Sequence, residues 1–232
     1  MSKNIAVILS GGTGTRIGGN VPKQYLEVHG KVIIMYCLET IAKMPEIGEM
    51  VICLADEWRP FVQEELRKVG ITKQVVYSQP GEVRQLTIYN ALKVLRELGV
   101  EDDAVVVIHD AARPLVSETL LRSCIEGCQE ADGVLPVLPV KDTLYLSKDG
   151  QSISSLLKRS EIVAGQAPEA FRFGKYLEVH DQMKYEDILK ISGSTEIAYK
   201  AGLNIKLVPG EELNFKITTT EDLDNLKHVL ER

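Results

Sequence analysis

The sequence predicts an α/β fold in which helices cover both faces of a mostly parallel β-sheet. Short apolar runs rich in β-branched residues alternate with stretches of helical periodicity. The apolar runs are almost uninterrupted, as expected for parallel strands that are buried on both faces. Ligands bind such sheets at the carboxyl ends of the strands, where the loops lead into helices.

The predicted elements follow this alternation along the chain. Strands are expected at 4–10, 49–55, 73–78, 104–110 and 133–140. Helices are expected between them, at 31–44, 57–70, 82–99 and 117–131. The tail adds a helix near 172–184, a strand at 204–209 and a final helix at 219–232, capped by Thr219 or Thr220. The length of 232 residues favours one domain, residues 1–232.

The stretch after residue 140 departs from this rhythm. Polar and apolar residues alternate there around a "KDGQ" turn, which predicts a β-hairpin at about 139–162. The hairpin is too short to have a core of its own. It is therefore either an arm that packs on another subunit or a flap on its own subunit.

Composition limits the function and the location. The net charge of −6 provides no general attraction to nucleic acid or to an anionic membrane. No apolar run approaches the roughly 18 residues of a spanning helix, and the start of the chain does not resemble a signal peptide. We therefore expect a cytoplasmic protein. The four cysteines form no CxxC pair and are expected to be buried, reduced thiols.

The first strand runs into a Gly-rich, cationic segment, "SGGTGTRIGGNVPKQY" (10–25). A dinucleotide fingerprint is disfavoured because the third glycine is missing and the second predicted strand ends in "CLADE", about 40 residues on, where an acid about 20 residues on is required. A Walker loop is also absent. Small residues allow backbone N–H groups to approach phosphate oxygens, and Arg16 and Lys23 are spaced to flank a triphosphate. The alternative is a glycine turn with solvated cations.

Two further segments place polar residues near the sheet edge. "HDAARP" (109–114) follows the most apolar strand, so that Asp110 could bind a cation or a hydroxyl and Arg113 a phosphate. An internal Asp–Arg ion pair is the alternative, and His109 is expected to be a structural hydrogen-bonding residue. "NFKITTTEDL" (214–223) places Lys216 in a short β-like run, where the ordinary expectation is an exposed strand residue. Hydrolase and metalloprotease motifs are absent.

Taken together, "GGTGTRIGGNVPKQY", "HDAARP" and "NFKITTTEDL" resemble the cytidylyltransferases that act on polyol phosphates. That family includes the methylerythritol 4-phosphate enzymes of isoprenoid biosynthesis and the ribitol 5-phosphate enzymes of teichoic acid and capsule synthesis. The resemblance covers roughly residues 4 to 230. It implies a Rossmann-like sheet of the nucleotide-diphospho-sugar transferase type, with a protruding β-hairpin arm that makes a homodimer. It also implies CTP and a polyol phosphate as substrates, and Mg²⁺ as cofactor.

The resemblance assigns roles to individual residues. The expected catalytic cations are Arg16, Lys23 and Lys216. The expected nucleotide contacts are Ser10, Gly11, Gly12, Gly14, Gly81, Glu82 and Thr87. Asp110 and Arg113 are expected at the acceptor, and Asp110 is the one candidate metal ligand. Thr143 and Arg159 are expected to reach the neighbouring subunit's site, with Arg159 on the acceptor phosphate.

Two departures from the family pattern fall on the acceptor side. Relatives usually carry Thr-Pro-Gln before a Phe, whereas this chain has Ala167 and Glu169 at the Thr and Gln positions. Relatives also carry an acidic Asp-Glu-Ala type stretch where this chain reads "ISGSTEIAYKAG" (191–202). A milder departure is Pro80-Gly81-Glu82, where relatives commonly have two glycines and an acid.

Four functions therefore compete. "GGTGTR" and the "GQ" before Ala167 resemble the ribitol enzymes, so D-ribitol 5-phosphate is the expected acceptor. Methylerythritol 4-phosphate is the alternative. An inactive nucleotide-binding regulator is disfavoured because Lys23 and Lys216 are both present. A sugar nucleotidyltransferase that uses another nucleoside triphosphate would differ in its nucleotide selectivity.

Overall fold

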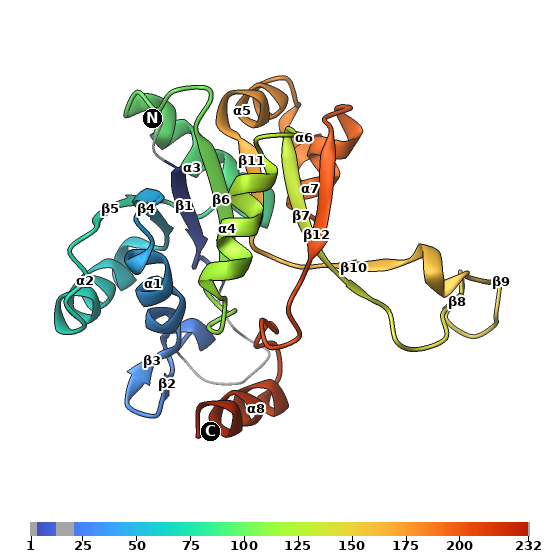
Figure 1. Ribbon diagram of the computed structural model, residues 1–232, viewed down its shortest axis with the longest axis horizontal. Helices are drawn as coiled ribbons and strands as arrows, with labels where there is room; N and C mark the ends of the chain where they lie inside the picture. Colours follow the sequence, from blue (N-terminus) through green and yellow to red (C-terminus); the bar gives the residue numbers. More distant parts are fainter. Residues whose placement is uncertain (1–3, 13–20, 232) are drawn as a thin grey trace.

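The chain folds around one mixed, mostly parallel sheet of eight strands. Its order is β10-β7-β11-β6-β1-β4-β5, and β12 pairs with β7. A computed structural model describes residues 4–12 and 21–231, and the helices pack on both sides of the sheet (Figure 1). The predicted architecture is confirmed. In the described part of the chain, no helix is long and apolar enough to cross a membrane.

The sheet strands are β1 (Asn4–Leu9), β4 (Ile47–Cys53), β5 (Gln74–Ser78), β6 (Val105–Asp110), β7 (Gly133–Pro139), β10 (Val163–Gly165), β11 (Glu169–Arg172) and β12 (Ile205–Pro209). The main helices are α1 (Ile33–Lys43), α2 (Arg59–Lys68), α3 (Arg84–Glu97), α4 (Glu118–Gly127), α5 (Phe173–Asp181) and α8 (Thr220–Leu230). Each predicted strand and helix of the first 140 residues is therefore present, with ends shifted by a few residues.

Strand β1 lies between β6 and β4, and both pairings are parallel. Its side chains alternate between two cores, as the period of a strand requires. Ala6 and Ile8 pack into the core that includes α1, α2 and α4. Ile5 and Val7 pack into the opposite core, which includes Phe171 and the buried faces of α3 and α5. Burial on both faces explains why this run is apolar throughout.

The sequence does not predict β11, which lies antiparallel between β6 and β7. This strand is only four residues long, and it begins directly beside the strand that ends in Asp110: Glu169 is paired with Ile108 in the register. A buried acidic residue is therefore placed next to the carboxyl end of β6.

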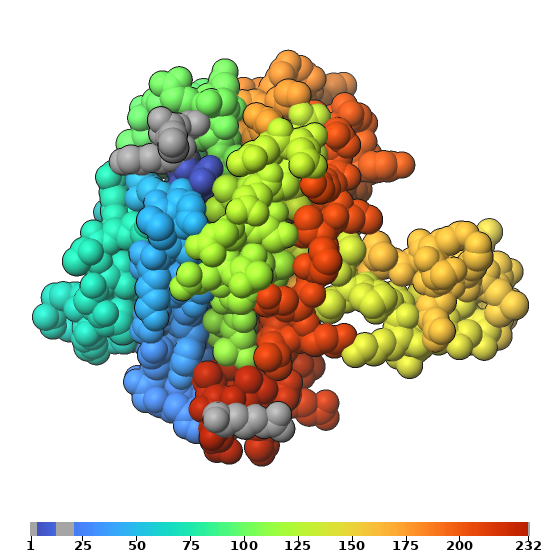
Figure 2. Space-filling view, viewed as in Figure 1, coloured from blue at the N-terminus to red at the C-terminus, as the bar shows by residue number. Residues whose placement is uncertain are grey.

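The segment after β7 forms the predicted hairpin, which protrudes from the body of the molecule (Figures 1 and 2). Its paired strands are β8 (Tyr145–Leu146) and β9 (Ser155–Leu156), and β10 returns the chain to the sheet. Apolar side chains on this arm face solvent: Ile153 is 65% exposed and Leu156 72%. This exposure is what an arm that packs on a second subunit would show in a single chain.

Some local predictions were wrong. Residues 214–218 form no strand: in the described part of the chain, the one backbone hydrogen bond from them to a neighbouring strand-end loop is that of Ile217 N to Ala112 O (2.9 Å), which is too few for a ladder. Two short helices, α6 (Tyr185–Ile188) and α7 (Ser194–Lys200), were missed. The final helix begins as predicted: Thr219 caps it, and the carboxylate of Asp222 accepts the Thr219 N–H in return. All four cysteines are free and buried, as predicted.

Candidate active site

A cavity of about 550 Å³ opens at the carboxyl ends of β1 and β6. Its lining comes from the loop after β1, the entry to α3, the end of β6 and the segment before α8. The lining residues are Leu9, Gly11, Gly12, Lys23, Gln24, Gly81, Glu82, Val83, Arg84, Thr87, Asp110, Ala112, Lys216 and Thr218. This is where a doubly covered parallel sheet is expected to bind its ligand.

The short 3₁₀ turn Lys23–Tyr25 is fastened to the loop after β1. The amide of Gln24 donates to Ser10 O (2.7 Å) and to Gly12 O (2.8 Å). The Ser10 hydroxyl donates to the phenol oxygen of Tyr25 at 2.8 Å, and both side chains are buried. Lys23 precedes these two anchored residues, so the turn delivers its amine to the cavity from a fixed backbone. Ser10 itself supports this turn and does not line the cavity.

Two glycines allow close packing of the loops that line one part of the cavity. A Cβ on Gly11 would come within 2.4 Å of Pro80 Cβ, and one on Gly81 would come within 2.4 Å of Leu86 Cβ. No larger residue fits either position without moving backbone. The Gly81 N–H also donates to the Thr87 hydroxyl (2.9 Å), which locks the loop onto the first turn of α3.

Asp110 lies at the centre of a cluster of positive charges. Its carboxylate is 3.0 Å from Lys216 Nζ, 3.4 Å from Arg84 Nε and 3.5 Å from Arg113 Nε. Burial would raise the pKa of Asp110, but the charges of Arg84, Lys216 and Arg113 outweigh it and hold the pKa well below its usual range. Asp110 is therefore an anion at every physiological pH.

Hydrogen bonds join the loop "HDAARP" (109–114) to the segment that carries Lys216 (214–218). Arg113 Nη1 donates to Asn214 O (2.8 Å), and the Ile217 N–H donates to Ala112 O (2.9 Å). These two bonds flank Lys216 and fix its backbone beside the end of β6. Arg113 is thus an internal brace whose side chain does not line the cavity. The sequence left two interpretations of this motif open, ligand binding or an internal Asp–Arg ion pair. The structure contains the ion pair between Arg113 and Asp110.

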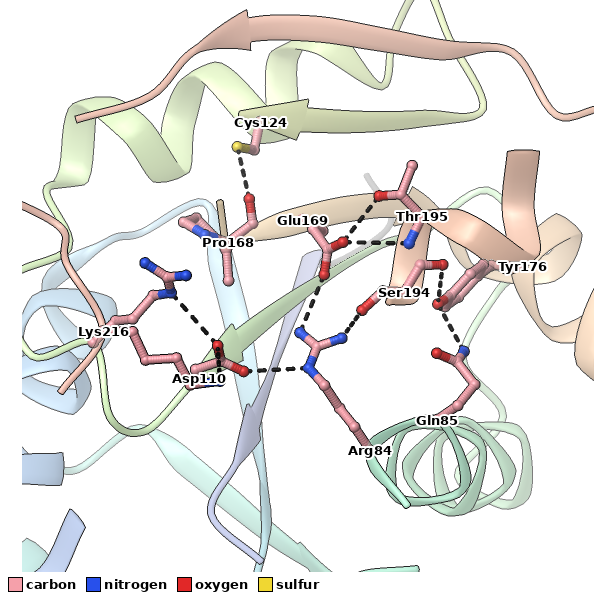
Figure 3. A network of polar contacts seen from close by, with 12 residues as sticks. Arg84, Gln85, Asp110, Cys124, Pro168, Glu169, Tyr176, Ser194, Thr195 and Lys216 are labelled. Atoms are coloured by element: carbon pink, nitrogen blue, oxygen red, sulfur yellow. Dashed lines mark hydrogen bonds and ion pairs between the residues drawn. The ribbon is translucent and has the colours of Figure 1, made fainter. Parts of the chain in front are cut away.

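Arg84 is the main residue that the sequence reasoning missed. It opens α3 and extends between two carboxylates, Asp110 on one side and Glu169 on the other (Figure 3). Its guanidinium also donates to the Ser194 hydroxyl. A cation in the first turn of a helix opposes the helix dipole, so its presence there is a signal that it has another partner.

His109 is a structural residue, as predicted. It is fully buried, and its Nε2 is 2.9 Å from Arg113 O. Burial lowers its pKa to about 4. The imidazole is therefore neutral near pH 7, and it fixes the carbonyl end of the loop that carries Arg113.

The structure brings most of the predicted site residues together. Eight of them line the one cavity: Gly11, Gly12, Lys23, Gly81, Glu82, Thr87, Asp110 and Lys216. Ser10 and Arg113 lie behind this lining. Thr143 and Arg159 lie on the arm, where Arg159 donates to Lys141 O (2.6 Å). Gly14 and Arg16 fall outside the described residues, so their roles stay predictions.

The family model for 2-C-methyl-D-erythritol 4-phosphate cytidylyltransferase (IspD) matches residues 4–232. The chain belongs to this family. It is therefore a CTP-dependent cytidylyltransferase, a nucleotidyltransferase, as the resemblance implied. The three segments that carry the resemblance, 11–25, 109–114 and 214–223, all contribute residues to the lining of this cavity. Residues 13–20 of the first segment lie outside the described part of the chain.

Solved structures of IspD-type enzymes share the fold over the whole chain. The 4-diphosphocytidyl-2C-methyl-D-erythritol synthase of Anaerococcus prevotii is 25% identical, with a TM-score of 0.82 and 99% of both chains covered. IspD of Francisella tularensis is 25% identical, with a TM-score of 0.81 and coverage of 98% of this chain and 99% of that one. These similarities favour the methylerythritol alternative over the ribitol expectation.

The buried histidines make stability depend on pH. His109 and His180 both have pKa values lowered to about 4 by burial, against an ordinary value near 6.5. Between these values the unfolded chain binds more protons than the folded one, so stability falls as the pH falls from about 6.5 to about 4. Each histidine contributes a slope of at most about 1.4 kcal/mol per pH unit.

We expect His109→Gln to reduce this slope by one histidine's share. Urea unfolding at several pH values checks the expectation, and His228→Gln on the exposed surface of α8 is the control. An unchanged slope in His109→Gln would show that this imidazole is not held neutral in the fold.

Proposed function

We propose that the enzyme transfers the CMP group of CTP to 2-C-methyl-D-erythritol 4-phosphate and releases pyrophosphate. The match of the family model over residues 4–232 carries the proposal, because its description names this acceptor. The cavity supports it, since Lys23 and Lys216 both line a space of about 550 Å³ beside the loops expected to hold the nucleotide. D-ribitol 5-phosphate is the second candidate, favoured by "GGTGTR" and by the "GQ" that precedes Ala167.

The chemistry follows from the charges that line the cavity. An oxygen of the acceptor phosphate attacks the α-phosphorus of CTP; the new P–O bond forms as the bond to the leaving pyrophosphate breaks in line. Negative charge grows on the leaving group, and fixed cations stabilise it without reorganising. Lys23 faces that charge in this proposal. Lys216 would exchange part of its contact with Asp110 for the α- and acceptor phosphates.

Asp110 serves the other substrate. Its carboxylate accepts hydrogen bonds and, being an anion throughout the working pH range, is suited to orient the hydroxyls of a polyol. It repels phosphates. The hydroxyl end of a polyol phosphate is therefore favoured beside Asp110, and its phosphate end is favoured beside the lysines.

The residues of this cavity do not fit a metal held by the protein itself. Within residues 4–12 and 21–231, no group of three or more His, Cys, Asp or Glu side chains could hold a metal ion. Asp110 is already surrounded by cations. The Mg²⁺ we propose would therefore enter on the phosphate oxygens of CTP, which are the ligands it prefers.

We also propose a homodimer in which each arm completes the partner's site. The arm projects away from the body of the molecule (Figure 1) and exposes apolar side chains such as Leu156. Thr143 and Arg159 lie on it, and no residue of the arm lines the cavity described above. A phosphate contact from Arg159 therefore needs a second chain.

A pyrophosphate-release assay tests the proposed reaction. With CTP, methylerythritol 4-phosphate should give the highest kcat/KM in a panel that includes D-ribitol 5-phosphate and D-erythritol 4-phosphate. Lys23→Ala should lower kcat by at least about 100-fold, because it removes a charge needed at the leaving group. Lys68→Ala, an exposed lysine of α2 paired with Glu65, is the control. Preference for the ribitol ester would overturn the acceptor, and normal turnover by Lys23→Ala would overturn the mechanism.

Mixed dimers test the exchanged arm. Lys23→Ala and Arg159→Ala homodimers should both be inactive. A heterodimer of the two has one site with an intact body and an intact arm, so it should regain up to half of the wild-type activity per dimer. Purified, doubly tagged heterodimers measured in the same assay decide the point. No recovery in them would mean that each arm serves its own chain.

A further inference from the structure

Glu169 is a buried carboxylate with two partners: Arg84, which lines the cavity, and Thr195, which does not. It is 7% exposed. One oxygen, Oε2, accepts from Arg84 Nη2 at 3.1 Å. The other, Oε1, accepts from the Thr195 hydroxyl at 2.9 Å and from the Thr195 N–H at 3.3 Å. Both oxygens are therefore satisfied, and neither lines the cavity.

The two departures on the acceptor side of the sequence are in direct contact. Glu169 belongs to the first, and Ser194 and Thr195 belong to the second. Together they enclose the guanidinium of Arg84, which Ser194 and Glu169 both accept from (Figure 3). An acidic residue is absent from the 191–195 stretch, and an acidic residue is present at 169. On the side of Arg84 opposite Asp110, the negative charge is thus that of Glu169. Glu196, which follows that stretch, is paired with Lys200 and accepts from the Ser192 N–H.

Arg84 links this buried contact to the cavity. Its Nε lies 3.4 Å from Asp110, which is longer than the 3.0 Å between Asp110 and Lys216 Nζ. The charges of Asp110 and Glu169 outweigh the effect of burial and keep the pKa of Arg84 raised. Its Nε donates to Asp110, its Nη2 to Glu169 and its Nη1 to Ser194, so neither carboxylate receives a bidentate pair of hydrogen bonds. Glu169 therefore limits how strongly Arg84 engages Asp110.

We propose that Glu169 is a positioning residue that controls acceptor binding through Arg84. By drawing the Arg84 guanidinium toward itself, it leaves part of the Asp110 carboxylate available to the hydroxyls of the polyol phosphate. Without this charge, Arg84 turns fully onto Asp110 and competes with those hydroxyls. In the described part of the chain, the side-chain hydrogen bonds of Arg84 and Glu169 join them to each other, to Asp110, to Ser194 and to Thr195, and none of these partners is expected at the nucleotide. The inference rests on the proposed function, because it assumes a polyol phosphate as acceptor.

Glu169→Gln is the direct test, because glutamine keeps the shape and removes the charge. We expect kcat/KM for the acceptor to fall about tenfold, mainly through a higher KM, as for the loss of one charge-assisted hydrogen bond. The KM for CTP should change less than about twofold. Glu169→Asp, which keeps the charge, should retain more activity than Glu169→Gln. Glu46→Gln, which breaks a carboxylate–arginine pair outside the cavity, is the matched control and should leave both constants unchanged.

Moving the charge makes the test sharper. Ser194→Asp places a carboxylate beside the same guanidinium, so the double variant Glu169→Gln/Ser194→Asp should recover at least about half of the lost acceptor affinity, expressed as free energy. Equal losses for CTP and acceptor, or no loss in Glu169→Gln, would overturn the positioning role. If Glu169→Gln alone does not fold, the double variant Glu169→Gln/Ser194→Asp is compared with the wild type, and a KM for the acceptor raised about tenfold or more in that variant would overturn the proposal.

Failure of this inference can be told from failure of the proposed function. A wild-type enzyme that uses none of the acceptors in the panel overturns both together. A wild-type enzyme that is active on an acceptor, with a Glu169→Gln variant of the same constants, overturns this inference alone.

Discussion

The site depends on one buried carboxylate and the cations that surround it. Asp110 is 7% exposed, and its charge is compensated by Arg84, Arg113 and Lys216, which come from three separate parts of the chain. Removing a charge from a buried ion pair is expensive, because the partners left behind remain desolvated. The fold therefore keeps Asp110 and its three cations together. Because Asp110, Arg84 and Lys216 also line the cavity, the cavity wall carries one anion next to two cations.

This constraint explains why segments far apart in the sequence act as one. The loop after β6, the segment before α8 and the start of β11 are connected by hydrogen bonds around Asn214, which binds Arg113 and Gln166 through its carbonyl and Ala167 through its side-chain amide. Lys216 follows Asn214 by two residues. An irregular stretch without a strand can thus place a lysine as firmly as a strand would.

Much of the site could be predicted because a parallel sheet gathers the ends of its strands at one edge. Asp110 is the last residue of β6, and Gly11 follows the end of β1 by two residues; apolar periodicity was enough to locate both strands. Lys23 and Lys216 were placed by the family resemblance, since each lies in a segment without a long regular element. The sequence could not show that β11 inserts antiparallel beside β6, because a four-residue strand leaves almost no periodic signal. Glu169 and Arg84 therefore went unconnected.

The identity of the acceptor is the least predictable feature of the site, because the residues concerned are brought together by β11 and α7, two short elements that the sequence does not reveal. Ala167, Glu169 and Ser194 depart from the family pattern one by one, and only the packing of β11 and α7 against Arg84 relates two of these changes. When a change at one residue is balanced by a change at a distant residue that it contacts only in the fold, neither segment of a single sequence shows the connection. Residue-by-residue transfer from a family is consequently less direct on the acceptor side, where the residues of this chain differ from the family pattern.

The stability of Asp110→Asn measures the central constraint most directly. Asparagine has nearly the same shape, so the change removes the charge that holds three cations and leaves the core intact. We predict that the free energy of unfolding at neutral pH, measured in urea, falls by about 3–5 kcal/mol, as expected when one partner of a buried ionic cluster is lost. A variant as stable as the wild type would contradict the view that this carboxylate organises the site.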